Sequence, residues 1–102
     1  MVDLRDLQKQ ILQNKKDKGF NTTNVAEEFC RAYGELGEAY DAYKKHKPDL
    51  GEELADVAIF LLGISEILDI NLEEEIINKM QKNKNRVYVE KDGVRYKVNE
   101  HE

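Results

Sequence analysis

Four carboxylates in two short motifs are the residues of this sequence best suited to chemistry. Glu35 and Glu38 are three residues apart, and Glu53 and Asp56 repeat that spacing. Residues three apart share a helix face, so two neighbouring antiparallel helices would bring all four carboxylates together. Converging negative charges repel one another unless cations bind between them, and Mg²⁺ prefers oxygen ligands. The spacing therefore predicts a Mg²⁺ site, with Mn²⁺ as a substitute. The alternative is that each pair lies on a solvated helix face.

The elements that must position these carboxylates are helices. Apolar residues recur at helical spacing in four segments, which are about 3–17, 25–45, 50–68 and 72–86. Thr23 and Asn24 are suitable N-cap residues for the second helix, and Pro48 follows its end. From about 87 to 98 the pattern changes to alternation around Asp92-Gly93, which indicates a hairpin. We expect an all-α four-helix bundle with a short C-terminal β-hairpin.

Two helices carry more specific packing expectations. We expect Tyr33, Tyr40 and Tyr43 of the second helix to serve packing rather than ligand contact, and Cys30 to be a buried thiol. The other apolar members of this helix are Phe29 and Leu36. Gly34 and Gly37 lower helix stability, which suggests a closely approaching backbone or ligand. The segment 57–62 is apolar almost all round. A helix of that kind is buried on more than one side, so we expect a homo-oligomer.

Composition and charge limit the other function classes. The chain has 102 residues, enough for one domain spanning 1–102. Its net charge of −5 hides a balance of −10 over residues 27–75 and +5 over residues 76–97. An acidic chain is not typical of a nucleic-acid binder. A single cysteine excludes an intramolecular disulfide and a cysteine-based zinc site. No segment predicts a signal peptide or a membrane span, so we expect a cytoplasmic protein.

The order of the motifs resembles that of the MazG-like all-α nucleoside triphosphate pyrophosphohydrolases. The matching stretches are Gly34-Glu35-Leu36-Gly37-Glu38, then 52–57, then Lys79-Met80 with Asn83 and Arg86. The resemblance implies one MazG-like domain, with a helical core at about 3–86 and the hairpin at about 87–98. It implies that Glu35, Glu38, Glu53 and Asp56 bind Mg²⁺, with Glu35 and Glu38 as the catalytic candidates. Lys79, Asn83 and Arg86 are the implied substrate contacts, and Phe60 falls where relatives carry an aromatic residue near the base.

The implied reaction is hydrolysis of a (deoxy)nucleoside triphosphate to the monophosphate and pyrophosphate, as in house-cleaning of the nucleotide pool. The resemblance also implies a homo-oligomer, for which we favour a tetramer over a dimer. Two alternatives stay open. One is a related pyrophosphohydrolase acting on another nucleotide, such as phosphoribosyl-ATP. The other is a helical interaction protein that keeps the fold without the chemistry.

Overall fold

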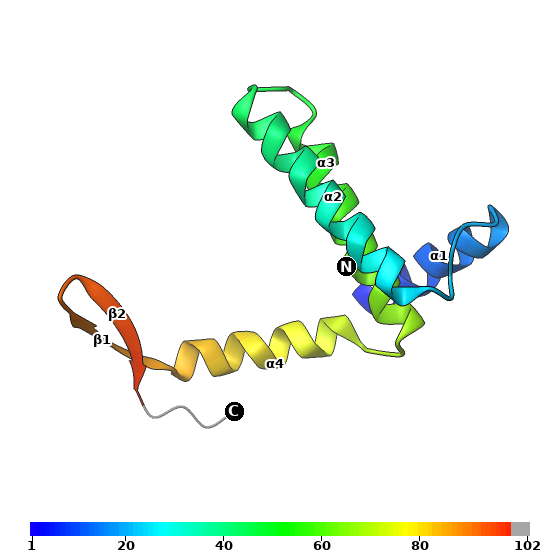
Figure 1. Cartoon of the computed structure of the whole chain (residues 1–102). Coiled ribbons are helices and arrows are strands. Elements are labelled where there is room, and N and C mark those ends of the chain that lie inside the picture. The colour runs from blue at the N-terminus through cyan, green and yellow to red at the C-terminus, as the bar shows by residue number, and fades with distance from the viewer. Residues whose placement is uncertain (99–102) are drawn as a thin grey trace. The chain divides into compact units, whose positions relative to one another are not determined.

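The computed structural model describes residues 1–98 (Figure 1). The described residues form two compact units, Met1–Leu72 and 73–98. The elements, in order, are α1 (Leu4–Asp17), α2 (Val25–Lys44), α3 (Leu50–Ile67), α4 (Leu72–Asn85), β1 (Val87–Lys91) and β2 (Val94–Val98). The predicted class, four helices followed by a hairpin, is confirmed, and the helix ends agree with the sequence pattern to about one residue.

The helix starts follow their capping residues. The side chain of Asp3 accepts a hydrogen bond from the Asp6 amide at 3.1 Å, and Asn24 accepts one from the Glu27 amide at 3.1 Å. These side chains satisfy amides that have no partner inside the helix. Asp49 occupies the same position before α3 but makes no capping hydrogen bond. Its carboxylate is therefore left for other interactions.

The first three helices end in Schellman motifs, in which a left-handed residue reverses the chain. That residue is Gly19 after α1, His46 after α2 and Asp69 after α3, with φ values of 71°, 54° and 55°. After α1, the amide of Phe20 donates to the carbonyl of Lys15 at 2.9 Å. These motifs fix the short connections, and the first of them fixes the backbone position of Phe20 just after α1.

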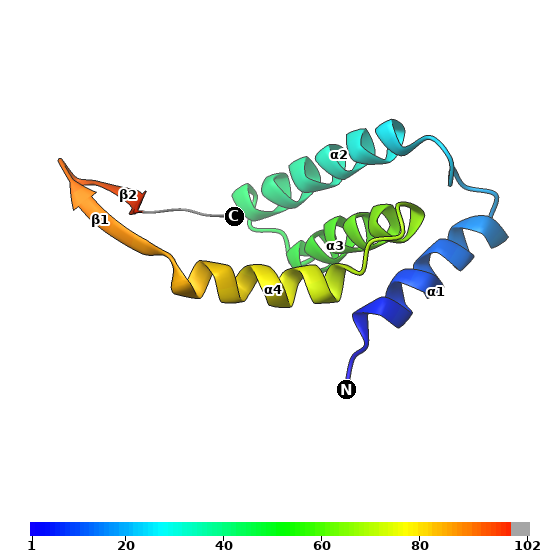
Figure 2. The same ribbon diagram turned by 90° about the horizontal axis from the view of Figure 1, so that it is seen from below.

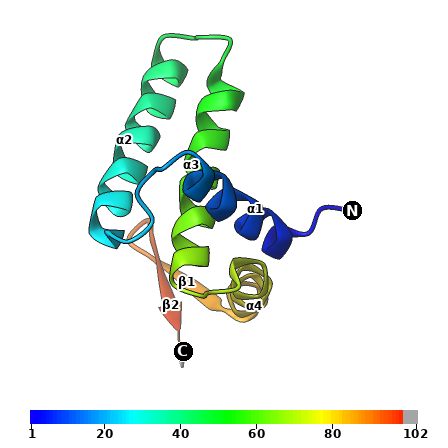
Figure 3. The ribbon, with the colours of Figure 1, turned by 90° about the vertical axis from the view of Figure 1, so that its right-hand side faces the viewer.

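The central helix of the first unit is α3, which packs against both α1 and α2. Figures 2 and 3 show α2 and α3 running side by side as a hairpin, with α1 lying across α3. The buried apolar residues are Ala39, Ala42, Leu62 and Ile64. Small residues allow close contact here: a Cβ built at Gly63 would lie 3.4 Å from Ile11 Cγ2 on α1.

The fully buried side chain of Gln8 fixes α1 across the end of α3. Its amide nitrogen donates to the Ile70 carbonyl at 2.8 Å and to Glu66 Oε1 at 3.2 Å. Its oxygen accepts from the Leu72 amide at 2.9 Å. All of the polar groups of this buried carboxamide have partners, as burial requires. The register of α1 on α3 is thereby set, and with it the place of the residues further along α1.

The expected packing of the three tyrosines of α2 is wrong for the single chain, and the other large apolar residues of this helix are exposed with them. Phe29, Tyr33, Leu36, Tyr40 and Tyr43 have exposed fractions between 45% and 75%. Cys30 is also exposed, contrary to the expectation of a buried thiol. The physical reason is that α2 turns its small residues, Ala39 and Ala42, into the helix contact. The large side chains form a separate stripe with the alternating spacing of four and three that is typical of helix pairing.

The second unit consists of α4 and the hairpin. The hairpin is antiparallel, with Val87 opposite Val98 and Lys91 opposite Val94. Asp92 and Gly93 have φ values of 54° and 79°, as a two-residue type I′ turn requires. This confirms the predicted Asp-Gly turn. Among the described residues, no helix is long and apolar enough to cross a membrane.

Candidate functional site

Three of the four predicted metal ligands meet on the α2–α3 hairpin. Glu35, Glu38 and Glu53 each bring one carboxylate oxygen into a group whose members all lie within 4.8 Å of one another. Glu35 and Glu38 come from adjacent turns of α2, and Glu53 comes from α3. The antiparallel packing of these two helices therefore produces the convergence that the sequence spacing predicts.

Two of these carboxylates carry oxygens that are buried and have no partner. Within the described residues, Glu35 Oε2 and Glu53 Oε2 are inaccessible to solvent and accept no hydrogen bond, and the same is true of Asp49 Oδ1. Burying unpaired carboxylate oxygens is costly. A cation between these carboxylates would offset that cost. An all-oxygen set of this kind suits a hard cation such as Mg²⁺.

The electrostatics of the cluster point in the same direction. Burial raises the pKa of Glu35, and the charge of Glu38 and a hydrogen bond to its carboxyl raise it further, followed by the charges of Asp56 and Glu53. Partial burial likewise raises the pKa of Glu53, with added repulsion from Glu38, Asp49 and Asp56 and an opposing effect of Lys47. In the absence of a cation, the cluster therefore holds protons more tightly than isolated glutamates do.

Asp56, the fourth predicted ligand, lies outside the three-glutamate group. It is exposed on α3, one turn after Glu53. Its charge still contributes to the raised pKa of both Glu35 and Glu53. It is therefore close enough to act electrostatically on the cluster, and its role as a ligand stays a prediction.

The cluster borders a polar cavity of about 540 Å³ on the α2–α3 hairpin. Glu38 and Glu53 line it together with Gly34 and Gly37, whose missing side chains leave it open. A Cβ at either glycine would meet no atom of the described residues within 4 Å, so the suggestion of a closely approaching backbone is wrong within this chain. The ligand that was suggested as the other reason for these glycines has room here.

Sequence reasoning missed two residues that line this cavity, Lys47 and Asp49. Both lie in the connection between α2 and α3, next to Pro48. Lys47 Nζ lies 3.9 Å from Asp41 Oδ2, too far for a hydrogen bond. The position of Asp49 one turn before Glu53 is the sequence signal that could have identified it, because residues four apart share a helix face.

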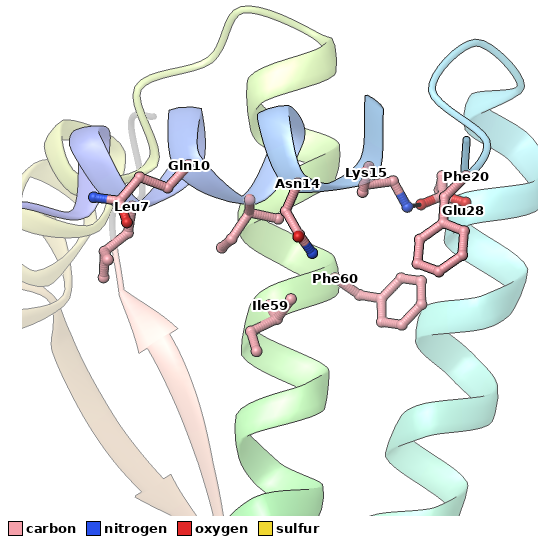
Figure 4. A pocket seen from close by; sticks show the side chains of 10 residues that line it. Leu7, Gln10, Asn14, Lys15, Phe20, Glu28, Ile59 and Phe60 are labelled. Carbon is pink, nitrogen blue, oxygen red and sulfur yellow. Dashed lines mark hydrogen bonds and ion pairs between the residues drawn. The ribbon is translucent and has the colours of Figure 1, made fainter. Parts of the chain in front are cut away.

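Phe60, the predicted base contact, lines a different and mostly apolar pocket of about 330 Å³ (Figure 4). Its walls come from α1, the loop after α1, α2 and α3. Phe20 supplies a second aromatic ring, and Lys15 Nζ lies 5.4 Å from the centre of the Phe60 ring. That distance is suitable for a cation–π contact.

A buried ion pair closes one end of this pocket. Lys15 donates to Glu28 Oε1, and Asn21 donates to Glu28 Oε2 at 3.0 Å. Burial acts to raise the pKa of Glu28, but the hydrogen bonds from Lys15 and Asn21 and the charges of Lys15 and Arg31 outweigh it, so the pKa is lowered. Glu28 is therefore ionised and fully paired, unlike the carboxylates of the cluster two turns further along α2.

The remaining predicted substrate residues belong to the second unit. Lys79 and Asn83 lie four residues apart on α4, and Arg86 follows the end of the helix. The amide of Arg86 donates to the Asn83 carbonyl at 3.3 Å. This spacing places Lys79 and Asn83 on one helix face. Their contact with a substrate stays a prediction.

The fold and the carboxylate cluster define an all-α chain with a candidate cation site on a helical hairpin. Searches of protein-family models, of curated proteins and of solved structures find nothing that matches this chain.

Proposed function

We propose that this chain is a Mg²⁺-dependent nucleoside triphosphate pyrophosphohydrolase, as its resemblance to the MazG-like family implies. The observation that carries the proposal is the convergence of Glu35, Glu38 and Glu53 within 4.8 Å. The partnerless buried oxygens of Glu35 and Glu53 add to it, because they favour a bound cation over a solvated helix face. Asp56 and the cavity-lining Asp49 are additional oxygen donors close to this group.

In the proposed reaction, the oxygen of a water forms a bond to the α-phosphorus while the bond from that phosphorus to the bridging oxygen breaks. Pyrophosphate leaves, and the water proton passes to a base. Bound Mg²⁺ would lower the pKa of the water and neutralise phosphate charge. Glu35 and Glu38 are the candidates for orienting the water or accepting its proton. Lys79, Asn83 and Arg86 are proposed to contact the phosphates or the nucleoside, and Arg86 can bind phosphate through two parallel hydrogen bonds.

The relative positions of the cluster and the apolar pocket suit a nucleotide. Glu28 and Glu35 are two turns apart on α2, and Phe60 and Glu53 are two turns apart on α3. At 1.5 Å per residue, each pair spans about 10 Å along its helix. A nucleotide with its base near Phe60 and Phe20 would then direct its phosphates along the hairpin toward the cluster. Aromatic side chains stack on bases without regard to sequence.

The exposed apolar stripe of α2 supports a homo-oligomer. Five large side chains, from Phe29 to Tyr43, follow the spacing of a helix-pairing seam and stay uncovered in the single chain. Contiguous apolar surface of this kind marks protein interaction sites. We propose that copies of the chain cover this stripe in a tetramer, and that the enzyme acts on the nucleotide pool of the cytoplasm.

The experiment that tests the proposal is a product analysis in water enriched in ¹⁸O. The chain is incubated with Mg²⁺ and a panel of canonical and modified nucleoside triphosphates, and the products are analysed by mass spectrometry. We expect nucleoside monophosphate and pyrophosphate in equal amounts, with the label in the monophosphate. Label in the pyrophosphate would place the attack on the β-phosphorus. Release of inorganic phosphate, or no hydrolysis of any substrate, would refute the proposal.

A further inference from the structure

One polar side chain that lines the apolar pocket, Asn14, differs from its polar neighbours in its hydrogen bonding. The Asn14 carboxamide extends from α1 toward Ile59 and Phe60 (Figure 4). Within residues 1–98 its side chain makes no hydrogen bond, although three other polar side chains of the pocket do. Gln10 donates to Asp6, while Lys15 and Glu28 bind each other. Asn14 is exposed, so a ligand that enters the pocket can reach it.

The surroundings of Asn14 limit what it can recognise. The pocket offers two phenylalanine rings, Phe20 and Phe60, and an aliphatic side chain, Ile59. Such walls favour a flat apolar ring, while a carboxamide presents one donor group and one acceptor. Proteins that hold an unstacked base combine these elements, with rings against its faces and polar side chains on its Watson–Crick edge.

We propose that Asn14 reads the hydrogen-bonding edge of the nucleobase and is a specificity-determining residue. This inference rests on the proposed function for the identity of the ligand, a nucleotide. The carboxamide can orient its oxygen toward an exocyclic amine, as in cytosine, or its nitrogen toward a carbonyl, as in uracil. The wild-type chain therefore accepts both bases, and a residue with acceptors only would discriminate between them.

The test measures binding of CMP and UMP, without catalysis, by isothermal titration to the full chain. Asn14→Asp replaces the donor by an acceptor, so it should change the ratio of the two affinities about tenfold or more in favour of CMP. Asn14→Leu should weaken both nucleotides by a similar factor. Gln13→Leu is the matched control, because Gln13 is the neighbouring α1 residue and binds Asp17 outside the pocket. It should leave both affinities within about twofold of the wild type.

Unchanged relative affinities in Asn14→Asp would overturn the inference, as would a failure of the wild-type chain to bind either nucleotide. An equal response of the Gln13 and Asn14 variants would also overturn it. Circular dichroism of each variant excludes loss of fold as the cause. The outcome is separable from that of the proposed function. Discrimination by Asn14 without any triphosphate hydrolysis would refute the proposed function alone, whereas hydrolysis with unaltered base preference would refute this inference alone.

Discussion

Glu35 on α2 and Glu53 on α3 place carboxylate oxygens within 4.8 Å of each other, and each has one carboxylate oxygen that is buried without a hydrogen-bond partner among the described residues. Two such carboxylates repel each other when both are ionised, and a cation between them removes this cost.

Mg²⁺ should stabilise the folded chain. Because the cation binds the folded cluster, the free energy of unfolding should rise by about 2.7 kcal/mol when Mg²⁺ is at about 100 times its dissociation constant. The measurement is thermal unfolding with and without Mg²⁺. Glu53→Gln should lose most of this gain, while Glu52→Gln, a neighbouring exposed glutamate outside the cluster, should keep it. Equal gains in the two variants would contradict a site at Glu53.

Neutralising Glu35 should stabilise the metal-free chain. Glu35→Gln removes a charge whose repulsion with Glu38, Asp56 and Glu53 raises the pKa of the group. The variant should therefore melt a few degrees higher than the wild type without Mg²⁺ and gain less from adding it. A lower melting temperature of the metal-free variant would show that the charge of Glu35 stabilises the fold.

Metal affinity should fall as the pH falls, starting above the ordinary titration range of glutamate. The pKa values of Glu35 and Glu53 are raised, so the folded chain holds protons that Mg²⁺ must displace. The same protons stabilise the fold, and their contribution is present at low pH and is lost as the pH rises through the raised pKa values. Titration calorimetry in two buffers of different ionisation enthalpy measures the released protons. Binding without proton release in this range would contradict the prediction.

Asp56→Asn should remove turnover and leave the fold intact. Replacing a residue that only supports a metal ligand lowers metal affinity or activity about 10–100-fold. Replacing a ligand itself should therefore lower kcat/KM at least about 100-fold. Because Asp56 is exposed, its replacement should not unfold the chain, so a loss of turnover would not come from a loss of fold. The rate of pyrophosphate release and the circular dichroism spectrum test both statements. A variant with nearly wild-type turnover would restrict the site to the three glutamates.

The Lys15–Glu28 pair should give the fold its acid sensitivity. The pKa of Glu28 is lowered, so its contribution to stability is present above the pKa of the unfolded chain and is lost as the pH falls through the lower folded value. Glu28→Gln leaves the partly buried Lys15 without its counter-ion, at a cost of about 3 kcal/mol near neutral pH. Chemical denaturation at several pH values measures the difference in the free energy of unfolding between the wild type and Glu28→Gln. The double variant Lys15→Met, Glu28→Gln should recover part of the loss, and a cost independent of pH would argue against the ion pair.

The sequence predicted the elements well because their signals are local. Asn24 as a cap, Asp92-Gly93 as a turn and the apolar periodicity each depend on neighbours along the chain. The convergence of Glu35 and Glu53 could be predicted with one further assumption, the antiparallel packing of two helices.

The exposed stripe of α2 was missed because periodicity shows that Tyr33 and Tyr40 share a face, without showing what covers it. Lys47 was missed because its place in the cavity depends on the geometry of the turn, and Asp49 was missed although its spacing of four from Glu53 indicates a shared helix face. Asn14 was missed because a polar residue on a helix is ordinarily solvated.

The most direct test of the proposed chemistry compares pyrophosphate release by the wild type, Glu53→Gln and Glu52→Gln on one hydrolysed nucleoside triphosphate with Mg²⁺. We expect the wild type and Glu52→Gln to release pyrophosphate at similar rates, chelation of the metal to stop both, and Glu53→Gln to be inactive. Hydrolysis that survives chelation, or that proceeds equally in Glu53→Gln, would contradict a metal-dependent reaction at the carboxylate cluster.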